Sequence, residues 1–126
     1  MTEIRLEHVS YAYGQERILE DINLQVTSGE VVSILGPSGV GKTTLFNLIA
    51  GILEVQSGRI ILDSEANPKG RVSYMLQKDL LLEHKTVLGN IILPLLIQKV
   101  DKAEAIARAD EILAAFQLTA VRDKYP

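Results

Sequence analysis

Alternating hydrophobic and polar positions open the chain and predict an antiparallel β layer. Residues 4–9 alternate in this way, which is typical of a strand with one face in water. Residues 15–20 are expected to form a turn and a short edge strand, and residues 22–27 repeat the alternation as a second clear strand. The pair Ser28-Gly29 then predicts a turn into the next segment.

A continuous apolar run, Val-Val-Ser-Ile-Leu at 31–35, follows this layer and predicts a different kind of strand. Short runs without alternation are typical of strands that are buried on both faces in a parallel sheet. Residues 59–62 and 71–76 give two further strand patterns, joined by a short polar loop at 64–70. Together these patterns predict an α/β protein in which an antiparallel layer precedes a buried strand.

Hydrophobic residues at helical spacing predict three helices. Gly51 is a natural stop for the first helix, and Thr86 is a candidate N-cap for the second. Pro94 is expected to kink or break the second helix, and Asp101 resembles the cap of a capping box that starts the third. Residues 118–126 are polar and show no evident structural ending. The segments expected to be helical are 45–50, 87–99 and 102–116.

The composition is that of an ordinary globular domain, with 47% hydrophobic and 23% charged residues among 126. A net charge of −3 argues against nucleic acid as the main partner. The absence of cysteine excludes disulfides and thiolate chemistry, and it suits the cytosol. The longest apolar stretch, 91–97, is far shorter than the roughly 20 residues of a membrane helix, and the N-terminus does not resemble a signal peptide. We therefore expect any membrane role to be peripheral, through a partner.

A glycine-rich loop carries the clearest chemistry, because Gly36 to Thr43 fits the P-loop spacing G-x-x-x-x-G-K-[ST]. The loop lies between the predicted strand at 31–35 and the first predicted helix, which is the context that the motif requires. Its glycines let the backbone wrap around a polyphosphate, and its amides and the helix N-terminus supply hydrogen-bond donors. Lys42 would bind the β- and γ-phosphates, and the Thr43 hydroxyl is placed to ligate Mg²⁺.

A complete set of hydrolytic groups is not evident in the sequence. Asp63 follows the strand at 59–62, but Ser64 stands where a glutamate would complete an Asp-Glu pair. A strand that runs into a loop is the favoured explanation. Glu83 and His84 share one loop and are interpreted as solvated charges. The residues therefore predict nucleotide binding without the groups that drive hydrolysis.

Tyr11 and Tyr13 flank Ala12 in a short link before Gly14, which is unusual in a chain with 5% aromatic residues. One interpretation is packing of the β layer, and the other is a ring that stacks on a nucleobase. Both remain open from the residues alone. The nearby His8 is interpreted as an ordinary strand residue.

Several motifs together resemble the ATP-binding subunit of an ABC transporter over essentially the whole chain. The resemblance is carried by Tyr13, Gly36 to Thr44 with Leu45, Ile49-Ala50-Gly51, Ser57-Gly58, Gln77 and the stretch Thr86 to Ile91, which is similar to the family's TVxxNV. It implies a P-loop NTPase with an incomplete RecA-like core. Residues 1–85 would hold the antiparallel β-subdomain and the first part of that core, and 86–126 the start of the α-helical subdomain. The loop before Arg71 and residues 91–98 look most like the nitrate, sulfonate and taurine importer branch.

The resemblance implies ATP and Mg²⁺ as cofactors and a role for each matching residue. Tyr13 would stack on adenine, with Tyr11 the less suitable ring, and Gln77 would touch Mg²⁺ or the attacking water. The loop at 78–85 would face the coupling helix of a permease subunit, where Leu80 to Leu82 would form a contact patch or cap the local core. Lys42 and Gln77 are the expected catalytic residues, and Thr43 and Gln77 the expected metal-binding residues. The residues expected to bind ATP are Tyr13, Gly36, Pro37, Ser38, Gly39, Val40, Gly41, Lys42, Thr43 and Thr44.

The sequence departs from the family pattern after Tyr125-Pro126, where the LSGGQ signature is expected within a few residues. The Walker B acids, the D-loop and the switch histidine are not found either. We therefore expect the N-terminal portion of a longer ATPase subunit, inactive by itself and with apolar core surface exposed. The whole subunit would form a homodimer and drive solute transport, with import favoured, at the cytoplasmic face of the membrane. The alternatives are a nucleotide-binding module without turnover and a fragment that docks a membrane subunit.

Overall fold

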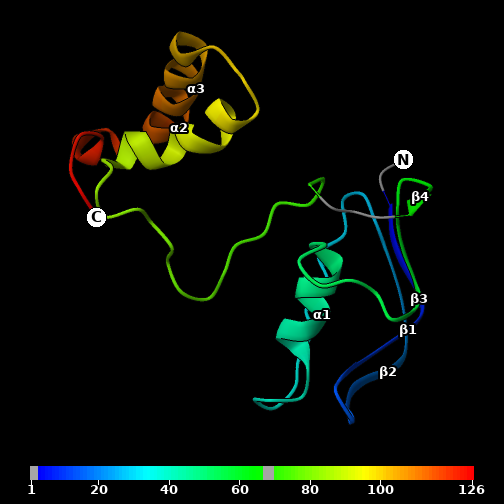
Figure 1. Ribbon diagram of the computed structural model, residues 1–126. Coiled ribbons are helices and arrows are strands. Elements are labelled where there is room, and N and C mark those ends of the chain that lie inside the picture. The colour runs from blue at the N-terminus through cyan, green and yellow to red at the C-terminus, as the bar shows by residue number, and fades with distance from the viewer. Residues whose placement is uncertain (1–2, 67–69) are drawn as a thin grey trace. The chain divides into compact units, whose positions relative to one another are not determined.

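A computed structural model of the chain describes residues 3–66 and 70–126, which form two compact units (Figure 1). We call Met1–Met75 the sheet unit and Leu76–Pro126 the helical unit. The polar loop predicted at 64–70 lies partly outside the described residues.

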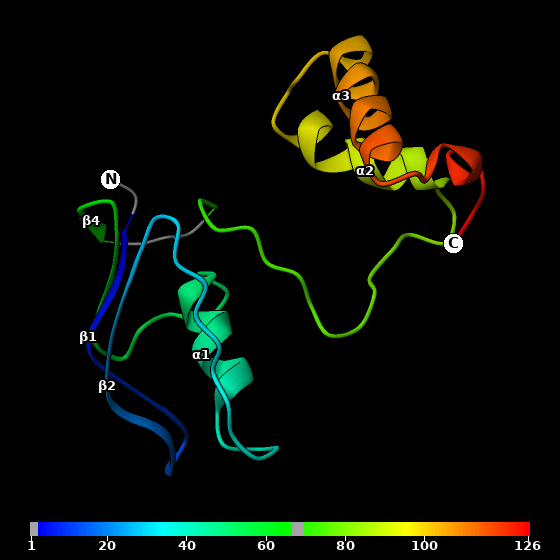
Figure 2. The same ribbon diagram turned by 180° about the vertical axis from the view of Figure 1, so that it is seen from behind.

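The sheet unit is a four-stranded antiparallel sheet in the order β2-β1-β3-β4, with helix α1 against one face (Figures 1 and 2). Its core joins apolar residues of the sheet to two leucines of α1, so the predicted antiparallel layer is confirmed. The elements are β1 (Glu3–Tyr13), β2 (Glu16–Thr27), α1 (Lys42–Ile49), β3 (Ser57–Leu62) and β4 (Glu65–Ala66). The core residues are Leu6, Val9, Leu19, Leu45, Leu48 and Ile60.

β2 is one long strand, where the sequence predicted a turn and edge strand at 15–20 and then a separate strand. The register with β1 shifts at a bulge, where His8 and Asp21 both have positive φ, 52° and 49°. The His8 Nδ1 and Asp21 Oδ1 atoms lie 2.6 Å apart, and the Asn23 Oδ1 accepts from the His8 amide at 2.9 Å. These bonds hold both strands bent together at the bulge, so the two predicted strand segments form one strand, while the predicted turn is present at residues 14–15. His8 is a strand residue, as predicted.

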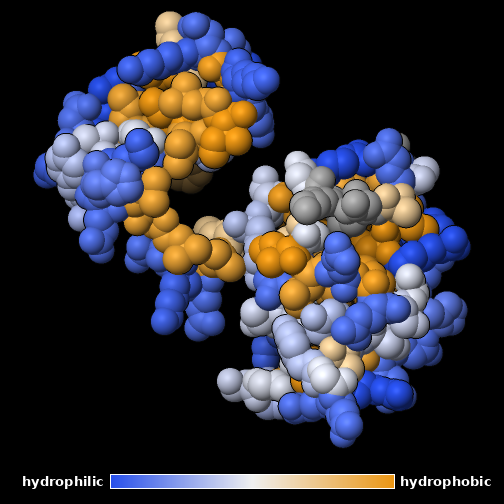
Figure 3. All heavy atoms as spheres, in the orientation of Figure 1, coloured by the Kyte–Doolittle hydropathy of each residue, from blue (hydrophilic) through white to orange (hydrophobic). Residues whose placement is uncertain are grey.

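The structure contradicts the buried strand predicted at 31–35 and the strand predicted at 71–76, because neither segment is a strand. Val31 and Leu35 are 95% and 90% exposed, and Met75 is 94% exposed. A strand needs a neighbour for its backbone N–H and C=O groups, and the described residues provide these two segments with none. The predicted exposure of apolar surface is observed, and hydrophobic residues reach the surface in Figure 3.

The end of α1 is the one predicted from Gly51. The Gly51 φ is 71°, its amide donates to the Leu48 carbonyl at 3.1 Å, and the Ile52 amide donates to the Asn47 carbonyl at 2.9 Å. This is a left-handed glycine stop that satisfies the last carbonyls of the helix.

The helical unit packs α2 (Val87–Ile97) against α3 (Lys102–Ala115), with a short 3₁₀ turn η1 (Thr119–Val121) in the polar tail. Of the predicted kink or break at Pro94, the break is wrong, because α2 continues to Ile97, and the kink stays a prediction. Pro94 lacks only its own amide, and its carbonyl still accepts from the Gln98 amide at 3.1 Å. The buried residues of this core are Ile92, Ala105 and Ala109.

Both predicted helix caps in this unit are present. The Thr86 hydroxyl accepts from the Gly89 amide at 3.1 Å, and the Asp101 carboxylate accepts from the Ala103 amide at 2.9 Å. The reciprocal half of the predicted capping box is replaced, because the Glu104 carboxylate pairs with Arg108. In the described part of the chain, none of these helices has the length and hydrophobicity needed to cross a membrane.

Candidate nucleotide-binding site

The loop from Gly36 to Gly41 runs directly into α1, whose first two residues are Lys42 and Thr43. Gly41 occupies the N-cap with a φ of 104°, a left-handed conformation that favours glycine. Gly41 has no side chain to accept from the first amides of the helix, so no side-chain cap occupies these donors. Free amides at a helix start beside a glycine-rich loop are suited to binding an anion.

The Lys42 ammonium folds back over this loop. Its Nζ donates to the carbonyl oxygens of Gly36 and Pro37, the latter at 2.7 Å. Phosphate oxygens would be stronger partners than these neutral carbonyls, because they carry charge. Thr43 is exposed, whereas Thr44 is buried. Of the two threonine hydroxyls, that of Thr43 is therefore the one accessible to a ligand.

Gly41 also packs directly against β2, in a contact that only glycine allows. A Cβ at this position would lie 2.8 Å from Ile18 Cγ2, 3.1 Å from Leu19 Cδ2 and 3.2 Å from the Ile18 carbonyl oxygen. These distances are too short for a side chain, so the close approach requires the glycine. The contact anchors the phosphate-binding loop to the end of the β1–β2 hairpin.

The same end of the hairpin carries the two tyrosines. Tyr11 pairs with Leu19, and Tyr13 pairs with Glu16 at the last rung before the turn. Ile18 is two residues from Glu16, or about 7 Å along a strand. Both views of the ribbon show the hairpin tip and the loop before α1 at one end of the sheet unit (Figures 1 and 2).

The two tyrosine rings contact each other edge to face, with centroids 5.1 Å apart and planes at 79°. Tyr11 is half-buried and packs against the core, whereas Tyr13 is 50% exposed. The two rings thus differ in burial. Tyr11 belongs to the packing, and Tyr13 presents a ring that a flat ligand can reach.

Gln77 lies in the helical unit, in an irregular and exposed segment. The sheet unit contains the P-loop and Tyr13, and both belong to the end of this unit where Gly41 packs against β2. The predicted role of Gln77 at the metal or the attacking water remains a prediction.

The candidate acidic residues do not form a catalytic group in the structure: Asp63 makes structural contacts, and Glu83 lies in an exposed loop. The Asp63 carboxylate accepts from the Glu3 amide at 2.9 Å and pairs with the Arg71 guanidinium at 3.2 Å, so it fastens the end of β3. Glu83 and His84 are exposed in their loop. Among the described residues, no group of three or more histidine, aspartate or glutamate side chains is arranged to hold a metal ion.

The carboxyl groups with lowered pKa values owe these shifts to contacts that hold the fold together. The hydrogen bond from Arg59 lowers the pKa of Glu7, and the contact with His8 lowers the pKa of Asp21. In the helical unit, the hydrogen bond from Arg122 lowers the pKa of Asp110. These contacts hold strands and helices in place, and so does the Thr27 amide that lowers the pKa of Glu30.

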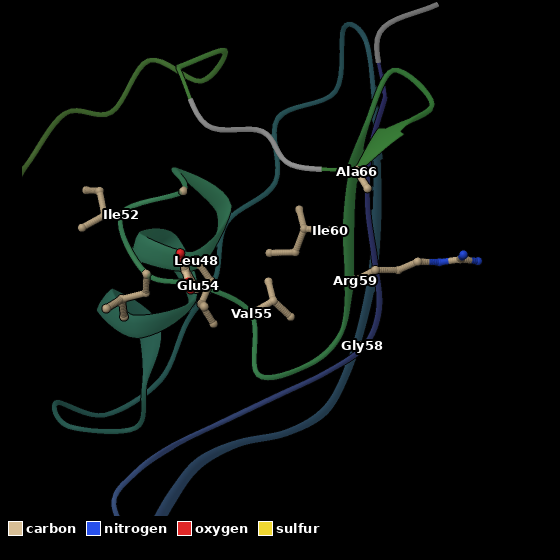
Figure 4. A pocket seen from close by; sticks show the side chains of 10 residues that line it. Leu48, Ile52, Glu54, Val55, Gly58, Arg59, Ile60 and Ala66 are labelled. Carbon is tan, nitrogen blue, oxygen red and sulfur yellow. The ribbon is translucent and has the colours of Figure 1, made fainter.

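An open cleft of about 420 Å³ lies at the other end of α1, between the segment that follows the helix and β3 (Figure 4). Leu48, Val55 and Ile60 line it with apolar groups, while the Arg59 side chain points away from it. Arg59 pairs with Glu7 at 2.5 Å instead. The cleft is lined by polar as well as apolar groups, and the phosphate-binding groups lie at the N-terminal end of α1 instead.

One residue beside the tyrosines, Gln56, was not predicted from the sequence. The Gln56 side chain bonds both polar backbone groups of Ala12, at 2.9 Å each. In the sequence, Gln56 is only a polar residue before the turn at Ser57-Gly58. Its partner, Ala12, is 44 residues away, so no local sequence pattern indicates the contact.

Comparison with known proteins gives a consistent result. The profile of the family described as "ABC transporter" matches residues 19–126. A spermidine/putrescine import ATP-binding protein, PotA, of Aggregatibacter actinomycetemcomitans is 40% identical over 98% of this chain. A sulfate/thiosulfate import ATP-binding protein, CysA, of Thermosynechococcus vestitus is 37% identical over 98% of it. The chain spans 34% and 38% of the lengths of these relatives.

Solved structures agree with the sequence relatives. The ATP-binding cassette MJ1267 superposes with a TM-score of 0.82 at 26% identity, over 99% of this chain and 58% of that one. The cassette MJ0796, in a dimeric post-hydrolysis state bound to ADP and phosphate, gives 0.79 at 27% identity, over 98% of this chain and 61% of that one. The family and the fold class predicted from the sequence are thus confirmed, while the likeness to the nitrate, sulfonate and taurine branch stays a prediction. The chain belongs to the ABC transporter family and is part of an ATP-binding domain of that family.

Proposed function

We propose that this chain binds MgATP at the loop before α1, as part of an ATPase that powers import across a membrane. The contact of Gly41 with Ile18 and Leu19 is the observation that best supports this function. It joins a phosphate-binding loop to a hairpin that presents an accessible aromatic ring, Tyr13. A nucleotide needs both parts, because its phosphates and its base bind to different chemistry.

Each residue of the site has a role in this proposal. The backbone of Gly36 to Thr44 and the start of α1 bind the phosphates, and Lys42 exchanges its two carbonyl partners for phosphate oxygens. Tyr13 stacks on the adenine. Mg²⁺ prefers oxygen ligands and usually keeps few protein ones, so the accessible Thr43 hydroxyl suits it alongside phosphate oxygens. The ion would neutralise phosphate charge.

The relatives support import as the direction of transport, because they are named import ATP-binding proteins. The proposed partners are a permease subunit and a second ATPase subunit, since the MJ0796 cassette has a dimeric structure. We place the whole subunit at the cytoplasmic face of the membrane, held there by the permease.

The structure also supports the two narrower alternatives. Asp63 is engaged by Arg71 and the Glu3 amide, which favours nucleotide binding by this chain without turnover. Leu80 and Leu81 are 70% and 50% exposed in the loop at 78–85, which favours docking of a membrane subunit there.

Calorimetric titration of MgATP, combined with a phosphate-release assay, tests the proposed function. The full chain is compared with Lys42→Ala, and with Lys102→Ala as an exposed control in the helical unit. We expect saturable binding that weakens about tenfold or more in Lys42→Ala only, because one charge-assisted contact to phosphate is lost. Equal binding by Lys42→Ala would overturn the P-loop assignment. Steady phosphate release by the chain would overturn binding without turnover.

A further inference from the structure

Gln56 makes an unusually complete contact with the backbone of β1. Its Nε2 donates to the Ala12 carbonyl oxygen at 2.9 Å, and its Oε1 accepts from the Ala12 amide at 2.9 Å. The side-chain amide therefore bonds Ala12 in the way that a peptide group of a neighbouring strand would.

The position of Gln56 explains why a side chain, and not a backbone peptide group, bonds Ala12 here. β3 begins at Ser57, and the last rung between β1 and β3 joins Ser10 to Ser57. Beyond that rung the main chain of β3 does not continue alongside β1. The Gln56 amide extends the ladder past the end of β3 and gives Ala12 a partner on that side.

Ala12 is the residue between the two tyrosines, so the contact fixes the backbone on which both rings stand. Tyr11 and Tyr13 are two residues apart, and alternation in a strand places them on one face. Tyr11 packs on the core and contacts Tyr13 edge to face at 5.1 Å between centroids. Tyr13 itself is half exposed at the strand end, where a backbone without partners on one side would be free to shift.

We infer that Gln56 is a positioning residue for the nucleobase, which it serves by holding Ala12 so that the ring of Tyr13 stays in place. This inference rests on the proposed function, because it needs Tyr13 to stack on the base. Gln56 acts on the base end of the site only. The phosphate end is set by Gly41 and Lys42, which do not contact Gln56 in the bonds described above.

Two magnesium-loaded probes separate the ends of the site, namely MgATP and magnesium tripolyphosphate, which has no base. We expect Gln56→Leu to weaken MgATP about fivefold, the effect of losing about 1 kcal/mol of hydrogen bonding, and to change tripolyphosphate by less than about twofold. Gln56→Met removes the same amide with an unbranched side chain, and it replaces the leucine variant if that one folds poorly. Gln25→Leu, at an exposed position of β2, is the matched control.

A double-mutant cycle with Tyr13→Ala distinguishes positioning from a general loss of stability. If Gln56 acts through Tyr13, Gln56→Leu has no further effect on MgATP affinity once the ring is gone. Amide hydrogen exchange at Ala12 should become faster in Gln56→Leu, independently of any nucleotide.

The outcomes separate this inference from the proposed function. Equal weakening of both probes by Gln56→Leu, unchanged affinity for MgATP, or additive effects with Tyr13→Ala would each overturn the positioning role. If Lys42→Ala bound both probes as tightly as the unaltered chain, the proposed function itself would be overturned. Loss of both probes in Lys42→Ala with no effect of Gln56→Leu would overturn the inference alone.

Discussion

The two units of this protein differ in how their predicted elements form. In the helical unit, the two helices predicted there fold close to their predicted bounds, and both predicted caps are present. In the sheet unit, the antiparallel strands form, but the apolar segments 31–35 and 71–76 do not become strands. The difference separates elements that form through local hydrogen bonds from strands that need a neighbouring strand.

The physical reason lies in the backbone hydrogen bonds. A helix satisfies its own N–H and C=O groups, whereas a strand satisfies them only beside another strand. The β1–β2 hairpin supplies its own neighbour through a short turn. The strand predicted at 31–35 is of the parallel type, which needs neighbours that are distant in sequence. Local hydrogen bonds therefore determine whether the helices of the helical unit form, whereas pairing between distant segments determines whether residues 31–35 form a strand.

In the helical unit, the C-terminal tail also forms hydrogen bonds with the start of α2. The first free amides of α2, those of Val87 and Leu88, donate to the Lys124 and Arg122 carbonyls at 2.8 and 2.9 Å. The Arg122 guanidinium in turn pairs with Asp110 on α3 at 2.6 Å. The polar tail, which showed no structural ending in the sequence, thus satisfies the start of α2.

The largest effect that separates the two units is expected from Gly58→Ala in β3. Gly58 has a φ of 80°, and a Cβ would lie 2.3 Å from the His8 carbonyl oxygen and 2.4 Å from that of Glu7. Because backbone cannot move aside cheaply, we expect the free energy of unfolding of the sheet unit to fall by about 3 kcal/mol or more. Urea titration followed by amide resonances of each unit should show a lower midpoint for the sheet unit only.

Gly29→Ala is the matched control for that variant. Gly29 has a similar φ of 89°, but a Cβ there meets nothing within 4 Å. Only the left-handed conformation then opposes the alanine, which costs about 1–2 kcal/mol. Equal losses in the two variants would show that the close approach to His8 is unimportant.

Asn90→Ala should have the converse effect and weaken the helical unit alone. The Asn90 Oδ1 accepts from the Leu82 amide at 2.7 Å, and its Nδ2 donates to the carbonyls of Leu82, Lys85 and Thr86 at 3.0–3.2 Å. Losing these bonds in a half-buried place should cost about 2 kcal/mol of unfolding free energy. The measurement is the same urea titration, with hydrogen exchange at the Leu82 amide as a local probe.

Asn90→Asp sharpens this test because it retains the acceptor for the Leu82 amide and removes the donors. We expect faster exchange at Leu82 in the alanine variant than in the aspartate variant. If both variants left the exchange rate unchanged, the loop before α2 would be held by other contacts.

The range of a contact explains what the sequence predicts and what it does not. The P-loop, the Gly51 stop and the caps at Thr86 and Asp101 each depend on residues within about five positions, so patterns locate them. The hydrogen bonds between Gln56 and Ala12 join residues 44 positions apart, and no sequence pattern predicts them. The burial of 31–35 was predicted from its composition, which records a preference for apolar surroundings but does not supply a neighbouring strand.

Alanine substitutions at Ile34 and Leu35 test directly whether 31–35 lacks a partner. Ile34 packs against the core, whereas Leu35 is 90% exposed. We expect Ile34→Ala to cost about 1–2 kcal/mol and Leu35→Ala less than about 0.5 kcal/mol, because only the first removes buried contacts. A strand buried on both faces would make the two losses similar. Urea titration of the sheet unit distinguishes these outcomes.

The smallest expected effect is a pH dependence confined to the helical unit. The hydrogen bond from Arg122 lowers the pKa of Asp110 below its ordinary value. A carboxyl with a depressed folded pKa adds stability that is fully present above its unfolded pKa and is lost as the pH falls through the folded value. We therefore expect the contribution of the pair to disappear below about pH 4.

Asp110→Asn isolates this contribution, since asparagine keeps the shape of the side chain and does not titrate. The helical unit of the variant should melt at a lower temperature than the unaltered chain at pH 7, and the difference should shrink as the pH falls below 4. The difference should be small and should decrease in high salt, because both side chains are partly in water. A difference that stayed constant with pH would mean that Asp110 acts by packing and not by charge. The sheet unit serves as the internal reference, because its own carboxyls with lowered pKa values, Glu7, Asp21 and Glu30, are unchanged in the variant.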